Sequence, residues 1–513
     1  MGCSTSKHEA PLSERRKNAG IGATEHLPYP RKGIGQTERM QSKQAKEAAK
    51  SSSTKKETLA PNADGIVKED PKVNENGHLM PEEVVKRTAS SIRPKKLLLG
   101  NSAKGGPALK LRYAYLTQRG YYPDDVHKAN QDSYSITNKF AGEDADSLFV
   151  VYDGHGKDGD ICAKYAQKEL PRAIAKYVRQ KRAILYRKQL QSEGKSLKGA
   201  FNPAMWPILD EHAYEDACHK AHVEVNEMMH DDKNVPDAFS GTTAISACFH
   251  FGRLTVCNVG DSRAVMGHRV PDAENGEASV PNSDKYEEEK VEEGEEAEPK
   301  KDISRKSGRL LAIPLSRDQT PFRKDERERI KAEGGIIQST DQMEGDQPIQ
   351  ENWGDMVLGE EIDIQGDPPR VWKEGKDYPG TAFTRSLGDS VGDEIGVYAE
   401  PEMLTTNLTK NDEILVIASD GVFEFMTNQA VIDICSQCDN PLEACQKVVK
   451  AAYDQWLVYE DRTDDITIIC AFLECDTPVP TNPEGTTAEL LNLASDTSGL
   501  KPVRKGASTN KIV

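Results

Sequence analysis

Apolar residues are distributed unevenly along the 513-residue chain, and their pattern divides it into three parts. Residues 1–108 are rich in Lys, Ser, Pro and Gly, contain few aromatic residues and show no sustained apolar period. Because such a segment cannot bury enough apolar surface to form a core, we expect a disordered, basic N-terminal arm. From 109 to 475, short apolar runs alternate with turn signals and helical stretches, which predicts one compact domain of strands and helices. Residues 476–513 are expected to form a flexible tail.

A polar and strongly acidic segment interrupts the central domain at about 269–308. Its composition excludes a packed core of its own. Because Leu254–Met266 before it and Leu310–Leu315 after it both have the apolar pattern of strands, we expect an expanded loop between neighbouring strands. A solvated loop is the simpler interpretation, and an acidic arm for a basic partner is the alternative.

The overall composition agrees with one domain that carries disordered additions, since only 36% of residues are hydrophobic and 29% are charged. The chain contains no apolar run long enough to cross a bilayer, and its ten scattered cysteines indicate reduced thiols in a cytosolic protein. Cys435 and Cys438 form a lone CxxC pair, which is insufficient for a zinc site. The formal net charge of −17 argues against general nucleic-acid binding.

Candidate chemistry begins where the predicted strands end. Four apolar runs lead into or out of an aspartate, and these aspartates are Asp153, Asp261, Asp420 and Asp464. A single Asp after a strand is usually part of a turn. Several carboxylates brought together, with Asp132 as a fifth, would raise one another's pKa unless a cation neutralised them. The pattern therefore predicts a metal centre.

The type of ligand indicates the type of ion. Oxygen donors with little imidazole or thiolate favour hard cations such as Mg²⁺ or Mn²⁺. Gly154 follows Asp153, and the exposed carbonyl of a glycine can approach a metal closely. A zinc site is the alternative, and it would use the histidines of one predicted helix. We expect these histidines to lie on the protein surface rather than to bind zinc. They are His212, His219, His222 and His230.

Two hard cations held by carboxylates are suited to activating water and stabilising an oxyanion, as in phosphate-ester hydrolysis. Such a reaction also needs a proton donor for the leaving alkoxide. His155 lies two residues after Asp153 and is the candidate for this role.

An ordered series of motifs then resembles a known family, the metal-dependent protein serine/threonine phosphatases of type 2C (PPM family). The resemblance extends from about Tyr113 to Leu473. Its motifs are Asn130-Gln131-Asp132, Asp153-Gly154-His155-Gly156, Ser240-Gly241-Thr242-Thr243-Ala244, Asn258-Val259-Gly260-Asp261-Ser262-Arg263-Ala264, Leu315-Ser316-Arg317-Asp318, Gly334-Gly335, Thr384-Arg385-Ser386-Leu387-Gly388-Asp389, Ala418-Ser419-Asp420-Gly421 and Asp464-Asp465-Ile466-Thr467.

The resemblance implies an α+β fold, a four-layer α-β-β-α sandwich of two mainly antiparallel sheets flanked by helices. It implies a type 2C phosphatase catalytic domain over 109–475 that hydrolyses phosphoserine and phosphothreonine through a water activated by two Mg²⁺ or Mn²⁺ ions. The expected partners are phosphoprotein substrates, and we expect a monomer.

The resemblance also assigns metal ligands. Asp153 would bridge the two metals, and Gly154 would bind through its carbonyl. Asp420 and Asp464 would complete one side of the centre, and Asp132 would act on the other metal through bound waters.

Further roles follow from the same resemblance. Asp261 and Glu424 would bind a third, weaker metal, and His155 would be the general acid. Many members carry a phosphate-binding arginine at the position where this chain has His127. Lys128 is therefore the candidate residue for binding the substrate phosphate, although lysine lacks the bidentate geometry of arginine. Gln131 occupies a position that is often acidic.

The N-terminus carries a separate signal. Met1-Gly2-Cys3-Ser4-Thr5-Ser6 matches the pattern for N-myristoylation on Gly2, with Cys3 available for palmitoylation. One myristoyl chain binds membranes only marginally, so palmitate and nearby basic residues would be needed for stable attachment. We expect the cytoplasmic face of a membrane, and otherwise the cytoplasm.

Three other functions compete with this interpretation. Gly388-Asp389-Ser390-Val391-Gly392 has the spacing of a serine-hydrolase nucleophile elbow, but that fold needs a later histidine and every histidine lies at or before His268. A kinase function is excluded because this chain lacks the glycine-rich phosphate loop and the His-Arg-Asp signals of kinases. A membrane-anchored pseudophosphatase scaffold is the remaining alternative, favoured only by Gln131 and His127.

Overall fold

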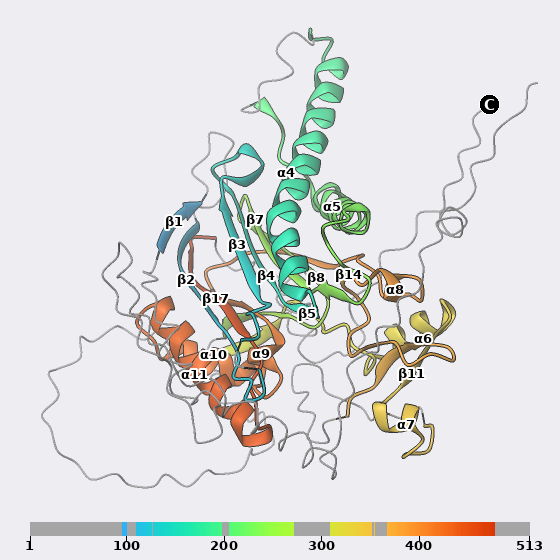
Figure 1. Ribbon diagram of the computed structural model, residues 1–513. Coiled ribbons are helices and arrows are strands. Elements are labelled where there is room, and N and C mark those ends of the chain that lie inside the picture. The colour runs from blue at the N-terminus through green and yellow to red at the C-terminus, as the bar shows by residue number, and fades with distance from the viewer. Residues whose placement is uncertain are drawn as a thin grey trace, which may run out of the picture. The chain divides into compact units, whose positions relative to one another are not determined.

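The computed structural model describes residues 95–99, 109–125, 127–196, 205–270, 308–350, 353 and 367–477 (Figure 1). The chain divides into two compact units, 1–69 and 70–513, and every described residue lies in the second. Apart from a few residues at their ends, the predicted N-terminal arm, acidic insertion and C-terminal tail lie outside the described residues.

Two antiparallel sheets form the centre of the second unit. The six-stranded sheet has the order β1 (Lys95–Leu99), β2 (Leu109–Gln118), β17 (Ile466–Cys475), β16 (Asp412–Ala418), β9 (Arg263–Val270) and β10 (Arg309–Pro314). The five-stranded sheet has the order β15 (Glu402–Asn407), β8 (Arg253–Val259), β7 (Ala244–His250), β4 (Asp146–Tyr152) and β3 (Ser133–Asn138). Apolar side chains of both sheets, such as Phe149 and Ile469, meet in a shared core.

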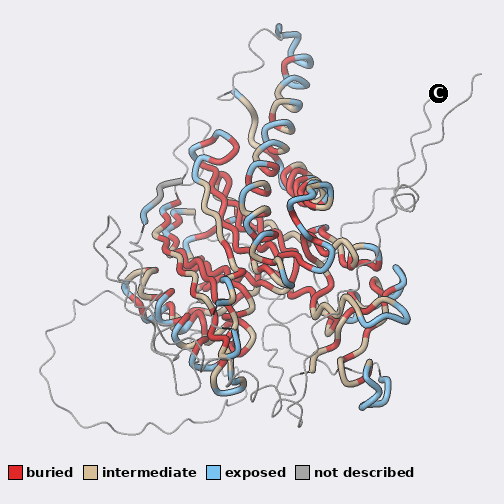
Figure 2. Tube along the Cα trace, in the orientation of Figure 1, coloured by how far each residue is buried: buried red, intermediate tan, exposed pale blue. Residues whose placement is uncertain are grey.

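Helices cover the outer face of each sheet. The long helix α4 (Gly159–Ser192) and α5 (Glu211–Asp231) pack on the five-stranded sheet, and α10 (Asn428–Ser436) and α11 (Pro441–Tyr459) pack on the six-stranded sheet. Strands β4 and β7 are buried along their whole length, and most of their residues are apolar on both faces. Figure 2 shows the buried residues concentrated between these layers. The four-layer α-β-β-α prediction is confirmed.

Side chains at the helix starts explain where these helices begin. The Asp210 carboxylate accepts a hydrogen bond from the Ala213 N–H at 2.8 Å and so caps α5. Asn440 caps α11 in the same way and is followed by Pro441 in the first turn. Both arrangements satisfy backbone donors that have no partner inside the helix.

Two small sheets lie beside the sandwich. The first contains β11 (Gly335–Gln338), β12 (Arg370–Lys373) and β13 (Pro379–Thr381), and α6 (Lys324–Ala332) packs against it. The second has the order β14 (Leu387–Gly388), β6 (Ser240–Thr242) and β5 (Gly154–Gly156). The remaining short elements are η1 (Phe140–Gly142), α7 (Thr340–Glu344), α8 (Ser390–Asp393) and α9 (Asp420–Phe423).

The structure corrects two expectations. The apolar run Leu254–Met266 is two strands, β8 and β9, because the turn at Gly260 has a positive φ of 106° and reverses the chain. The sheet also begins before residue 109, since β1 lies within the predicted disordered arm and pairs with β2. The acidic insertion does join neighbouring strands, because β9 pairs with β10.

Among the described residues, no helix is both long and apolar enough to span a membrane.

Candidate metal centre

The predicted aspartates meet at one end of the sandwich. Asp153 follows β4 and Asp132 precedes β3, and these neighbouring strands pair so that Tyr152 lies opposite Ser133. Asp420 follows β16 and Asp464 precedes β17, which pair in the other sheet. All four side chains are partly exposed. We call Asp132, Asp153, Asp420 and Asp464 the carboxylate cluster.

Crowding changes the protonation of this cluster. Burial raises the pKa of Asp153, and the charges of Asp420 and Asp132 raise it further. Burial, followed by the charge of Asp464, raises the pKa of Asp420 to about 6. In the described part of the chain, no salt bridge provides a cationic side chain for these four carboxylates. A bound cation would relieve their mutual repulsion.

Asp132 offers an oxygen for such a cation. Its Oδ2 accepts a hydrogen bond from the Ser419 hydroxyl at 2.9 Å, whereas its Oδ1 is buried and lacks a hydrogen-bond partner among the described residues. Burial and the charge of Asp465 raise the pKa of Asp132. A buried oxygen without a partner is costly, so this atom fits a metal ligand.

Glycine is required at position 154. A Cβ there would lie 2.4 Å from the Gly159 carbonyl oxygen and 2.6 Å from the Gln131 carbonyl oxygen. Any side chain would therefore push the start of α4 away from the segment that contains Asp153. The backbone of Gly154 can lie beside the carboxylates only because it has no side chain.

Gln131 has a structural role that explains its amide. Its Nε2 donates a hydrogen bond to the Gly156 carbonyl at 2.8 Å, and its backbone N–H donates to Asp465 Oδ2 at 2.7 Å. A carboxylate at this position would lack the donor for the Gly156 carbonyl. The Gln131 amide therefore supports the loop that contains His155.

The two candidates for a third site also lie near the cluster. Asp261 is in the turn between β8 and β9, and burial raises its pKa, with further contributions from Asp420, Asp318 and Glu424. Glu424 is one turn after Asp420, and its N–H donates to the Asp420 carbonyl at 2.7 Å. The predicted acids are thus brought together from both sheets.

His155 is held by a residue that the sequence did not single out. Its Nε2 lies 2.5 Å from Asp389 Oδ2, which also accepts a hydrogen bond from the Ser386 hydroxyl at 2.7 Å. Gly241 makes this contact possible, because a Cβ at 241 would lie 2.3 Å from Asp389 Oδ2 and 2.8 Å from His155 Nε2. The ring of Phe383 covers the imidazole at a centroid distance of 4.2 Å.

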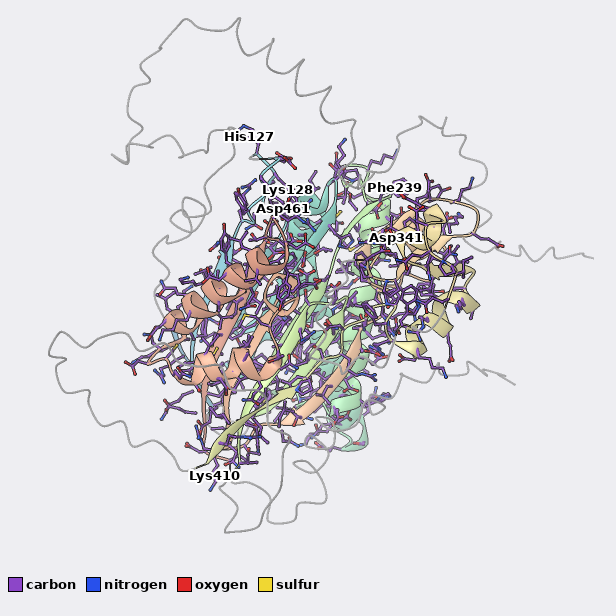
Figure 3. All side chains as sticks on the ribbon, turned by 90° about the horizontal axis from the view of Figure 1, so that it is seen from below. His127, Lys128, Phe239, Asp341, Lys410 and Asp461 are labelled. Carbon is purple, nitrogen blue, oxygen red and sulfur yellow. The ribbon has the colours of Figure 1, made fainter. Side chains whose placement is uncertain are left out.

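The structure places Lys128, the predicted phosphate-binding residue, differently from its neighbour His127. His127 is exposed, and Figure 3 shows it farther out from the domain than Lys128. Lys128 Nζ lies 3.7 Å from the ring centroid of Tyr122, whose hydroxyl donates to Asp464 Oδ1 at 2.6 Å. Lys128 is therefore connected to the carboxylate cluster through one side chain, and His127 is not.

Sequence comparisons match this chain to known proteins. The family model for protein phosphatase 2C matches residues 124–275 and 303–457. "Probable protein phosphatase 2C 35" of Arabidopsis thaliana is 36% identical over 372 residues, which cover 72% of this chain and 86% of that protein. The chain belongs to the protein phosphatase 2C family. It is a serine/threonine phosphatase of this metal-dependent family.

Structure comparisons give more distant matches. The serine-threonine phosphatase 2C of Toxoplasma gondii is 15% identical with a TM-score of 0.47, and the match covers 75% of this chain and 99% of that one. The catalytic domain of the serine threonine protein phosphatase PstP, solved in complex with two manganese ions, is 15% identical with a TM-score of 0.34. That match covers 71% of this chain and 99% of the PstP chain.

The helix α5 histidines of this phosphatase differ from the expectation of surface positions. His222 is fully buried, and its Nδ1 lies 2.8 Å from the Cys218 carbonyl. His230 is also largely buried and pairs with Asp237. His212 is exposed, as expected. The surface interpretation was wrong for His222 and His230, because both lie on the side of α5 that packs into the domain.

Several supporting residues of the phosphatase were missed by sequence reasoning. Asp465 is buried and accepts hydrogen bonds from the backbone N–H groups of Gly120 and Gln131, which ties β17 to the segment before β3. Thr243 Oγ1 accepts a hydrogen bond from the Asp153 N–H at 3.1 Å. One sequence signal was available for Asp389, since it ends the motif Thr384-Arg385-Ser386-Leu387-Gly388-Asp389.

Proposed function

We propose that this phosphatase holds two Mg²⁺ or Mn²⁺ ions with Asp153, the Gly154 carbonyl, Asp420, Asp464 and Asp132. The observation that carries the proposal is the cluster of partly exposed carboxylates without a cationic side chain, together with the unpartnered Oδ1 of Asp132. Oxygen ligands of this kind suit hard divalent cations. When bound, such ions generate a nucleophilic water and stabilise charge on phosphoryl oxygens.

We propose that Asp261 and Glu424 form a weaker third site beside the carboxylate cluster. The support is that the charges of Asp420 and Glu424 both raise the pKa of Asp261, and that the Glu424 N–H donates to the Asp420 carbonyl at 2.7 Å.

His155 is proposed as the general acid that protonates the leaving serine or threonine oxygen. Because Asp389 engages Nε2, the imidazole presents Nδ1 as the nitrogen that is available for the substrate. Asp389 is a positioning residue, since it acts on the substrate only through His155. The pair resembles other catalytic histidines that a buried carboxylate orients.

Lys128 is proposed to attract the substrate phosphate as a point charge. The change Lys128→Ala is expected to raise KM for a phosphopeptide by about tenfold with a smaller change in kcat, whereas Lys128→Arg retains the charge. An unchanged KM for Lys128→Ala at low salt would assign the phosphate contact to another group.

The decisive experiment measures phosphate release from phosphoserine and phosphothreonine peptides by the full chain, with Mg²⁺, with Mn²⁺ and after EDTA treatment. Activity should require the metal and should be lost in Asp153→Asn. A wild-type protein that shows no more activity than Asp153→Asn would favour the pseudophosphatase scaffold.

We also propose that the phosphatase binds the cytoplasmic face of a membrane through myristate on Gly2 and palmitate on Cys3. The support is the N-terminal motif, which lies outside the described residues. Membrane fractionation of the wild type and Gly2→Ala tests it, and an equal distribution of the two proteins would contradict it.

A further inference from the structure

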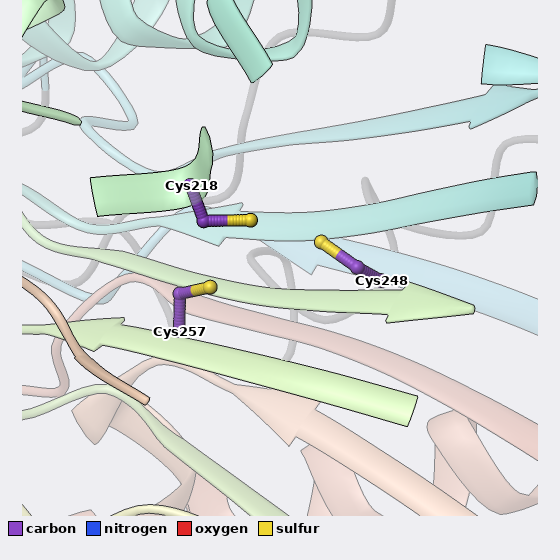
Figure 4. Close-up of side chains that lie close together, drawn as sticks. All are labelled: Cys218, Cys248 and Cys257. Carbon is purple, nitrogen blue, oxygen red and sulfur yellow. The ribbon is translucent and has the colours of Figure 1, made fainter. Parts of the chain in front are cut away.

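Three cysteine thiols meet in the core of the domain, between α5 and the five-stranded sheet. Cys218 belongs to α5, Cys248 to β7 and Cys257 to β8, and all three are fully buried. Figure 4 shows their sulfur atoms converging from the helix and from two adjacent strands. The three Sγ atoms all lie within 4.8 Å of one another. We call these residues the thiol cluster.

The spacing of the thiol cluster is close to that of a metal site. Thiolates bound at 2.3 Å to one tetrahedral zinc lie about 3.8 Å apart. Small side-chain movements would therefore bring all three sulfur atoms to bonding distance from one ion.

His222 provides a fourth candidate ligand, one helical turn after Cys218. Its Nδ1 lies 2.8 Å from the Cys218 carbonyl oxygen, so Nδ1 carries the proton and donates it. Its Nε2 is buried and has no hydrogen-bond partner among the described residues. Neither ring nitrogen belongs to the set of ligand atoms that lie within 4.8 Å of one another, so the imidazole would have to move toward the three thiols to bind the same ion. Metal-bound histidines commonly donate their second ring N–H to a backbone carbonyl in this way.

Packing alone explains the cysteines but not the histidine. Buried cysteines behave as small apolar residues, and the thiol cluster lies in a continuous apolar core. A buried imidazole nitrogen without a partner costs about 1–3 kcal/mol, which an apolar side chain would avoid. The opposite sheet offers a contrast: Cys435, Cys445 and Cys470 are also buried together, but they do not form a comparable set of mutually close ligand atoms.

We propose that Cys218, Cys248, Cys257 and His222 form a structural zinc site, separate from the catalytic centre. Three cysteines and one histidine are an established ligand set for structural Zn²⁺. Soft thiolate donors discriminate against Mg²⁺, which the carboxylate cluster suits, so the two sites would select different ions.

The proposed zinc site is connected through helix α5 to the segment that holds His155. Cys218, His222 and Asn226 recur every four residues and therefore lie on one face of α5. Asn226 Oδ1 accepts a hydrogen bond from the Gly388 N–H at 2.8 Å, directly before Asp389. A zinc ion that ties α5 to β7 and β8 would thus fix the helix that positions the Asp389 backbone.

The test uses the full chain with Asp153→Asn and Asp420→Asn, so that the catalytic centre does not retain metal. Metal content is measured by mass spectrometry after extensive dialysis, and Co²⁺ is exchanged in for absorption spectroscopy. We expect about one zinc per chain and, with Co²⁺, a thiolate charge-transfer band with tetrahedral d–d bands. Cys248→Ala should abolish both signals, whereas Cys445→Ala, a buried thiol on the other sheet, should keep them.

His222→Ala is the second variant, since it leaves all three thiols in place. It should weaken zinc binding in competition with a chelator even if Cys248→Ala fails to fold. A protein without tightly bound zinc and without a cobalt–thiolate band would overturn the proposal. Equal zinc content in Cys248→Ala and Cys445→Ala would also overturn it, and copper in place of zinc would overturn the choice of ion.

Discussion

Two groups of acidic side chains in this phosphatase have similar compositions but opposite surroundings. In the carboxylate cluster, aspartates face one another, and burial together with neighbouring negative charges raises the pKa of Asp153 and Asp132. Beside α6, the side chains of Asp325, Glu326 and Glu402 also lie close enough to hold an ion. There, arginines already occupy the positions that a cation would take.

The second group is saturated by ion pairs. Arg385 donates to both oxygens of Glu326, at 2.7 and 3.1 Å, and Arg329 donates to the same carboxylate. Arg323 bridges Glu402 and Asp325. Burial alone would raise the pKa of Glu326, but Arg385 and Arg329 hold it well below its ordinary value. We call this group the arginine-paired cluster.

The difference supports the proposed position of the metal centre. Acids that the chain itself neutralises contribute to folding, whereas acids left to repel one another depend on an ion from solution. Proximity of carboxylates is therefore insufficient evidence for a metal site. Whether a group of carboxylates needs a metal ion depends on whether positively charged side chains already surround it.

The largest effect is expected from Asp420→Asn in the carboxylate cluster. It removes a ligand charge, so kcat should fall by about 10³-fold, equivalent to about 4 kcal/mol of transition-state stabilisation. Steady-state kinetics and metal titration measure this. The matched control is Asp325→Asn in the arginine-paired cluster, which should keep normal metal affinity; a similar loss in both variants would remove the distinction between the two clusters.

Glu326→Gln should have the next largest effect, on stability. The change removes the carboxylate charge that pairs the partly buried Arg385 and Arg329, and we expect a loss of about 3 kcal/mol in the free energy of unfolding at pH 7. Because the pKa of Glu326 is lowered in the folded state, its stabilisation is present above the ordinary glutamate pKa and is lost as the pH falls. Denaturant unfolding at pH 7 and pH 3.5 should therefore show a smaller difference between wild type and variant at the lower pH.

Asp389→Asn tests whether Asp389 supports catalysis by holding the His155 imidazole in place. We expect kcat to fall by about 10- to 100-fold with little change in KM, because His155 loses the partner that holds its imidazole. The control is Asp412→Asn, which removes a similar partner from the buried His268, 2.7 Å away, outside the carboxylate cluster. A similar fall in kcat in Asp412→Asn would indicate a purely structural role for Asp389.

The smallest effect concerns the metal-free protein. Since the pKa of Asp420 is raised from 3.8 to about 6, the folded state binds its proton more tightly than the unfolded state does. Stability should therefore be highest below about pH 4 for this group and should fall as the pH rises through 6. Thermal unfolding with EDTA should show this decline, and Mg²⁺ or Asp420→Asn should reduce it. A melting temperature that rises between pH 4 and 6 in EDTA equally in wild type and Asp420→Asn would contradict it.

Sequence reasoning was most successful where the chemistry is local. The acids that follow or precede apolar strands, Asp153, Asp420 and Asp464, could be found because strand ends place consecutive residues predictably. It was less successful where one apolar run contained two strands. Gly260, with its positive φ, and Asp261 divide Leu254–Met266 into two strands, although Gly and Asp are themselves turn signals in the sequence.

The sequence by itself determined the family, the four-layer fold and the acids proposed to bind metal, because each depends on motifs and periods within short segments. Only the tertiary structure decided which partners these residues have. Asp389 and His155 are 234 positions apart, and the cysteines of the thiol cluster come from three separate elements. The physical reason is that the burial of a side chain, the charges around it and its hydrogen-bond partners all depend on residues that are close in space. Only the folded chain determines which residues these are.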